Sequence, residues 1–146
     1  MKKLKSTVLS NALEAMGYNV HAEWFLDENY NVFDDDDVAD YVWAQTKEVT
    51  KILDPYVPDR SDCDDFAWLL KAFAIIGQKK GSKQDAGIAF GWVAYKQDSG
   101  VHHAINMAFT SIDNSTQLKV RFFEPQTGQE VYLSNREKLN IHMIVC

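Results

Sequence analysis

The stretch VHHAINMAFTSIDNSTQLKVRFFEP, residues 101–125, contains two runs in which apolar and other side chains alternate. Alternation with a period of two is typical of a β-strand that buries one face. Asp113 and Asn114 lie between the two runs, and both residue types tolerate the positive φ of a tight turn. The stretch therefore predicts an antiparallel hairpin with strands at 101–109 and 118–124.

Closing the hairpin at this turn places His103 opposite Glu124 on the face that carries the apolar residues. Directly opposed residues have Cβ atoms about 5 Å apart, which is close enough for a hydrogen bond between the two side chains. A loop at 97–100 would place Ala94 beside the same histidine, on the preceding strand. A charged pair on a core face is costly unless it is satisfied or used, so the pair is either structural or functional. His102 faces the other way and is the rival base.

Apolar residues recur at helical spacing in the first half of the chain, and short β-prone runs fill the second half. Between the first two helical stretches, residues 21–33 are polar and rich in aromatic residues, which predicts a connection. Helices followed by strands predict an α+β fold with N-terminal helices packed on a C-terminal antiparallel β-sheet. The helices are predicted at 4–16, 36–53 and 62–76, and the other strands at 87–96, 131–133 and 141–145.

The length of 146 residues predicts one domain, 1–146, with a mainly helical part at 1–77 and a sheet part at 86–146. A net charge of −6 argues against nucleic acid as a partner, because phosphate contacts need clustered basic residues. No apolar run approaches the roughly 20 residues that span a bilayer. Two cysteines form no disulfide framework, so we expect a reduced, cytoplasmic thiol protein.

The third predicted helix opens with SDCDDF, so that Cys63 lies in its first turn after the N-cap candidate Ser61. Free N–H groups at a helix start favour a thiolate, whereas the neighbouring aspartates repel one. One interpretation is a half-buried, inert thiol. The other is a nucleophile, because the apolar sheet face must pack on this helix and would bring the thiol to an imidazole held by a carboxylate.

Cysteine, histidine and acid follow one another as Cys63, His103-Ala104 and Glu124, and in this order the sequence resembles the papain-like cysteine peptidase superfamily. The motifs CDDFA, HAIN and EPQTG further resemble the papain-like C-terminal domain of the Marasmius agglutinin type of fungal lectin and related small bacterial and phage proteins. The similarity covers roughly residues 20–146. It implies a papain-like α+β fold, and it implies no sugar binding, since no lectin domain is covered.

The resemblance implies a thiol hydrolase that cleaves an amide bond of a peptide, protein or glutamine-type substrate. Cys63 would be the nucleophile, His103 the general base and acid, and Glu124 the group that orients the ring. Transglutaminase- or deamidase-like acyl transfer is an alternative on the same residues. A catalytically silent module that binds a protein partner is another alternative.

One position departs from the papain pattern, since Val57 stands where the family has a glutamine six residues before the cysteine. The oxyanion-hole donor would then come from Tyr56, Trp24 or Gln126, beside the backbone N–H of Cys63.

No cofactor is required by this chemistry, although a bound cation is an open alternative. Asp62, Asp64 and Asp65 could hold Ca²⁺ beside the thiol, where the cation would offset their repulsion of a thiolate. The acidic run at 34–37 is better explained as capping the second helix. His21 and His142 belong to no recognisable constellation, and we expect them to be structural. The oligomeric state stays open.

Overall fold

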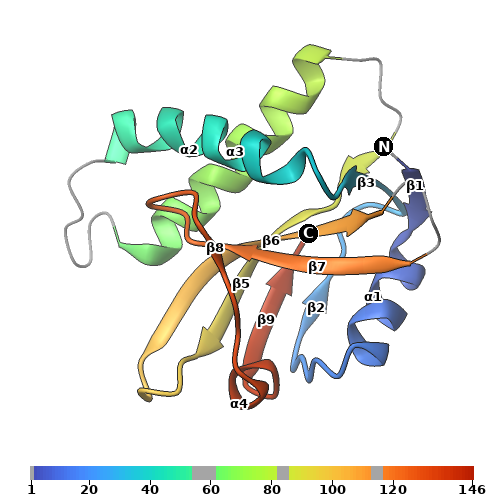
Figure 1. Ribbon diagram of the computed structural model, residues 1–146, viewed down its shortest axis with the longest axis vertical. Coiled ribbons are helices and arrows are strands. Elements are labelled where there is room, and N and C mark those ends of the chain that lie inside the picture. The colour runs from blue at the N-terminus through green and yellow to red at the C-terminus, as the bar shows by residue number, and fades with distance from the viewer. Residues whose placement is uncertain (1, 54–61, 82–85, 113–116) are drawn as a thin grey trace.

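The computed structural model describes residues 2–53, 62–81, 86–112 and 117–146 (Figure 1). Within these ranges nine strands join in one sheet, whose main path runs β1-β3-β6-β5-β9-β2, with β4 beside β3 and β7 and β8 beyond β6. The strands are β1 (Lys2–Lys5), β2 (Glu23–Trp24), β3 (Asn29–Asp34), β4 (Gly87–Ile88), β5 (Phe90–Lys96), β6 (His102–Ser111), β7 (Leu118–Phe123), β8 (Glu130–Val131) and β9 (Ile141–Val145). The helices are α1 (Ser6–Ala15), α2 (Val38–Leu53), α3 (Cys63–Gly81) and α4 (Asn135–Lys138).

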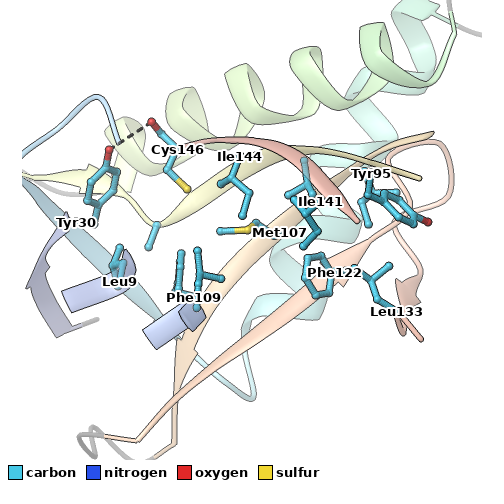
Figure 2. Close-up of a cluster of buried hydrophobic side chains, with 14 of the residues drawn as sticks. Leu9, Tyr30, Tyr95, Met107, Phe109, Phe122, Leu133, Ile141, Ile144 and Cys146 are labelled. Carbon is cyan, nitrogen blue, oxygen red and sulfur yellow. Dashed lines mark hydrogen bonds between the residues drawn. The ribbon is translucent and has the colours of Figure 1, made fainter. Parts of the chain in front are cut away.

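One hydrophobic core lies between α1 and the sheet, which curls around it (Figure 2). Leu9 and Leu13 are buried here because they are four residues apart and share one face of α1. At one end of this core the Tyr30 hydroxyl donates a hydrogen bond to the backbone oxygen of Cys146, at 3.3 Å. The centre is filled by strand residues of one parity, such as Met107 and Phe109.

A second core lies on the opposite face of the sheet, under α2 and α3 (Figure 1). Phe66 and Leu70 lie four residues apart on α3 and are both buried there. Asn106 fixes the helix to the sheet, because its Nδ2 donates to the backbone oxygens of Ala67 at 2.9 Å and Gly91 at 3.1 Å. No helix in the described ranges is long and apolar enough to cross a membrane.

The predicted fold class, a papain-like α+β fold with N-terminal helices packed on a C-terminal antiparallel sheet, is wrong. Three strands come from the first 34 residues, and the sheet is mixed, with parallel pairs between β3 and β6, β3 and β4, and β2 and β9. Helices lie on both faces of this curled sheet, with α1 opposite α2 and α3. Strand β3 was missed because its four inner residues are all buried, which removes the alternation expected of a half-buried strand.

The predicted register of the β5–β6 hairpin is wrong by one residue. Lys96 pairs with His102, so His103 lies beside Tyr95 and not beside Ala94. The loop is one residue longer than expected, because Gly100 adopts a φ of 89° and its N–H bonds the backbone oxygen of Gln97 at 2.8 Å. The shift exchanges the neighbours of the histidine but leaves the alternation along β6 intact.

The β6–β7 hairpin keeps the predicted faces with a register shifted by two residues. Phe109 pairs with Val120, where the sequence predicted Leu118. A shift of two returns every side chain to the same face, so the apolar residues still meet one another. The predicted turn at Asp113 and Asn114 lies outside the described residues.

Candidate functional site

The predicted hydrogen bond between His103 and Glu124 is present, with 2.9 Å between Nε2 and Oε2. The histidine is near the start of β6, and the carboxylate follows the end of β7. The ring of Tyr95 lies against the imidazole, with 5.9 Å between ring centroids. Both side chains of the pair are mostly covered, at 19% and 24% exposure, which shields the hydrogen bond from water.

The turn after β7 holds Glu124 in place. The backbone N–H of Gly128 donates to the Glu124 backbone oxygen at 2.8 Å, and the Gln126 N–H approaches the carboxylate at 3.4 Å. Gly128 has a φ of 70°, and its Cα faces α2 so closely that a Cβ would lie 3.1 Å from the backbone of Trp43. The EPQTG motif is therefore a turn packed tightly on α2.

Cys63 is the first residue of α3, and its half-buried side chain belongs to the cluster that includes Ala94 and Met143. Burial raises the pKa of the thiol, and the charges of Asp62 and Asp64 raise it further. The Ala104 backbone N–H donates toward the sulfur and partly offsets these effects. The thiol therefore stays protonated at neutral pH, in contrast to the thiolate that a helix start alone would favour.

Cys63 and His103 approach the same point of β6 through different contacts. The thiol meets the backbone of Ala104, the residue that follows the histidine, whereas the imidazole meets Glu124. Joint action of the three side chains stays a prediction.

Two of the three oxyanion-hole candidates, Trp24 and Gln126, lie within the described residues. Trp24 is on the edge strand β2 and is 58% exposed. The backbone N–H of Gln126 is directed to the Glu124 carboxylate, at 3.4 Å. Tyr56 lies outside the described residues, as do Val57 and the N-cap candidate Ser61.

The aspartates at the start of α3 bond one another. The Asp62 backbone N–H donates to the Asp65 carboxylate at 3.3 Å. A side-chain hydrogen bond with Asp62, followed by burial, raises the pKa of Asp64. Among the residues that the structure describes, no group of three or more potential ligands is arranged for a metal ion. Calcium binding at these residues stays a prediction.

A polar groove of about 780 Å³ lies between the end of α1, the start of α2, β7 and β8. Sequence reasoning missed it, because its lining comes from separate segments of the chain. The groove combines three acidic and three basic side chains with two tyrosines. Its lining residues are Met16, Tyr18, Asp35, Asp36, Ala39, Leu118, Lys119, Val120, Arg121, Glu130, Tyr132 and Lys138.

Hydrogen bonds fix the charged groups of this groove. Arg121 donates to both carboxylate oxygens of Glu130, from Nε at 2.8 Å and from Nη2 at 2.6 Å. Asp35 accepts from the Thr110 hydroxyl at 2.6 Å and from Lys119 Nζ at 2.9 Å. Burial alone would raise the pKa of Asp35, but these hydrogen bonds and the nearby cations outweigh it and lower the pKa. The groove therefore presents ionised groups at fixed positions.

This chain is similar to one known protein family. The model of the family described as "Agglutinin C-terminal" matches residues 29–130. A comparison with curated proteins finds no match.

Two solved structures share the fold, each with a TM-score of 0.71 and 19% sequence identity over 99% of this chain. One is the PSL1a-E64 complex, and the other is the Polyporus squamosus lectin bound to the human-type influenza-binding epitope Neu5Aca2-6Galb1-4GlcNAc. This chain spans about half of each, namely 51% and 49%.

These findings correct the predicted function. The matched family is an agglutinin family, and one structure of the same fold is a lectin in complex with a glycan. They contradict the predicted thiol hydrolase, its acyl-transfer alternative and the silent papain-like module. The predicted peptide substrate finds no support in these comparisons, since the one ligand named for a structure of this fold that is a lectin is a glycan.

Proposed function

Because the chain belongs to the Agglutinin C-terminal family, we propose that it is a carbohydrate-binding domain whose ligand occupies the polar groove lined by Asp35, Arg121, Glu130 and Tyr132. The volume of about 780 Å³ is within the range of small-molecule sites, roughly 300–1,000 Å³, and suits one or two sugar rings. The observation that carries the proposal is the combination of immobilised, planar charged groups with aromatic rings in one groove.

The immobilised charges suit hydroxyl groups. A sugar hydroxyl both donates and accepts a hydrogen bond, so its site needs donors and acceptors in fixed positions. A carboxylate offers about four acceptor positions, and Glu130 uses two oxygens toward Arg121 while keeping further lone pairs. Because the ion pairs already hold these groups, a ligand pays little ordering entropy for them.

The tyrosines supply the apolar part of the site. Tyr132 is 84% exposed, so its ring is accessible to a ligand in the groove. Tyr18 is held at the other side by the edge of Phe122, with 5.7 Å between ring centroids. The C–H face of a pyranose packs on an aromatic ring, whereas its hydroxyls point sideways toward polar groups.

The charge balance of the groove favours a neutral sugar. Asp35, Asp36 and Glu130 are matched by Lys119, Arg121 and Lys138, which gives no net charge. An acidic sugar would have to compete with the carboxylates that already pair with Arg121 and Lys119. The sialylated glycan named for the Polyporus lectin is bound by a chain twice as long, so its identity is not carried over.

From the resemblance to the papain-like superfamily, the proposal keeps only the set of three side chains and no enzymatic activity. We propose that Cys63, His103 and Glu124 form a polar cluster that orders the start of β6, with no reaction assigned to it.

The test is a glycan array probed with the whole chain, followed by calorimetric titration of the strongest neutral glycan. Tyr132→Ala should weaken binding by about tenfold or more, which corresponds to about 1.4 kcal/mol. Trp43→Ala is the matched control, because Trp43 is also exposed, at 54%, but lies outside the groove. The absence of any bound glycan, or equal losses in the two variants, would overturn the proposal.

A further inference from the structure

Three of the four histidines gather at one end of the sheet. The ring of His142 lies 4.9 Å from the ring of His102 and 5.6 Å from the ring of His21, measured between centroids. The three residues come from β9, from β6 and from the segment before β2. The sequence pattern had left His21 and His142 without a constellation, and only the fold brings them together.

A β-bulge explains the position of His142. Ala94 pairs with Met143 and Tyr95 pairs with Ile141, so His142 is the extra residue between them. Such a residue is displaced from the ladder and its side chain is re-aimed. The bulge directs the imidazole toward His102, which is opposite Lys96 on the neighbouring pair of strands.

The charges that act on His142 are all of one sign. Burial lowers the pKa of its imidazole, and the charges of His102, His21 and Lys96 lower it further. Within the described part of the chain, the Nε2 atom of His142 is buried and has no hydrogen-bond partner. His21, His102 and Lys96 are exposed, so a solute can reach the cluster. This is a concentration of basic groups in a chain whose net charge is −6.

A transition metal is the first ligand to consider for three imidazoles, but the geometry does not favour it. In the described ranges no three donors from His, Cys, Asp and Glu are arranged to hold one ion. Lys96, which cannot ligate a metal while it is protonated, also belongs to the cluster. A ligand that accepts several hydrogen bonds from cations fits better.

We propose that His21, His102, His142 and Lys96 form a binding site for a small oxyanion of the sulfate or phosphate class, which is occupied when the imidazoles are protonated. Both nitrogens of a protonated imidazole donate hydrogen bonds, so an oxyanion would offer the acceptors that the cluster lacks. Lys96 also lines a pocket of about 300 Å³ with Arg136 and Asp98. Two carboxylates lie in this neighbourhood, since the Asp98 backbone N–H donates to the Glu137 carboxylate at 3.1 Å.

The pH dependence follows from the groups named. Without an anion, the His142 pKa is below its ordinary value of 6.5, so the folded state binds that proton less readily than the unfolded state. Stability is therefore lost as the pH falls below about 6.5, and an anion that pairs with the cations should restore it. An ordinary imidazole loses its proton between pH 5 and pH 8, so the attraction should be weaker at pH 8.

The experiment is calorimetric titration of the whole chain with sodium sulfate at pH 5.5 and pH 8.0, with sodium chloride used to hold the ionic strength constant. Sulfate keeps its charge over this range, so a change in affinity reports on the protein. We expect affinity at least about tenfold higher at pH 5.5, since several protonated donors are gained. In NMR titrations, sulfate should raise the pKa of His142 toward its ordinary value.

His102→Gln should lower sulfate affinity at pH 5.5, whereas His103→Gln should not. These neighbours on β6 have side chains of opposite parity, which makes them a matched pair. Equal losses in both variants, or sulfate binding that does not depend on pH, would overturn the proposal. Tyr132→Ala should leave sulfate binding unchanged, so the outcome is independent of the proposed glycan site.

Discussion

Arg121 and Glu130, on the adjacent strands β7 and β8, form a bidentate ion pair at 2.8 and 2.6 Å. Both side chains are about four-fifths covered, at 19% and 23% exposure, so water screens the pair less than a surface pair. Two parallel N–H···O bonds also fix the relative orientation of the two planar groups. This orientation is the feature of the groove that a glycan site would use.

Arg121→Lys should weaken this pair, because an ammonium group cannot make the two parallel bonds of a guanidinium group. We expect a loss of about 1 kcal/mol in the free energy of unfolding, measured by urea denaturation. Lys51→Gln is the control, since Lys51 pairs with Glu48 at 2.6 Å on the exposed surface of α2 and should contribute less than about 0.5 kcal/mol. Equal effects of the two variants would contradict the prediction.

Gly128→Ala should destabilise the turn that holds Glu124. The residue has a φ of 70°, and an added Cβ would lie 3.0 Å from Thr46 Oγ1 and 3.1 Å from the Trp43 backbone. Strain and crowding together should cost about 2 kcal/mol or more. Gly100→Ala has a similar φ of 89° but meets nothing within 4 Å, so it should cost only about 1 kcal/mol. Thermal unfolding of the two variants compares them directly, and equal losses would show that the contact with α2 is unimportant.

The two cysteines should differ in their reaction with iodoacetamide. Burial raises the Cys146 pKa to about 12, so this thiol should react only after unfolding. Burial and nearby carboxylates also raise the pKa of Cys63, but its side chain is only half-buried. Its alkylation rate should therefore keep increasing above pH 9, as mass spectrometry of the labelled peptides would show. Rapid alkylation of Cys63 at pH 6 would contradict the direction of this shift.

Asp35→Asn should remove a pH-dependent contribution to stability. The pKa of Asp35 is below its ordinary value of 3.8, because hydrogen bonds and nearby cations outweigh its burial. The contribution of such a carboxylate is complete above pH 3.8 and is lost as the pH falls through the folded-state pKa. The melting temperatures of the wild type and Asp35→Asn should thus differ at pH 7 and converge near pH 2. A constant difference between pH 7 and pH 2 would show that Asp35 acts by packing alone.

Elements with a strong local period could be predicted from the sequence. Helices α2 and α3 were found because their apolar residues recur at helical spacing and face the sheet. Strands β6 and β7 were found by their alternation, and with them the His103–Glu124 contact, which tolerates a register shift of two residues. The period decides which face a side chain occupies, and this information is local.

Pairings between distant segments could not be predicted. Strand β3 pairs in parallel with β6, whose paired residues come 77 positions later (Phe33 with Thr110), and its burial on both faces hides its period. The groove joins the end of α1, the start of α2, β7 and β8, and the histidine cluster depends on a bulge in β9. None of these contacts leaves a repeating pattern in the chain.

The sequence by itself determined the faces of α2, α3, β6 and β7, because helix and strand geometry assign faces from residue spacing alone. The tertiary structure decided the mixed order of the strands, the position of α1 on the opposite face, and the two polar clusters proposed as binding sites. The reason is physical: strand order and bulges depend on which surfaces fit when the chain closes on itself. That fit is a property of the whole packed core and of no single segment.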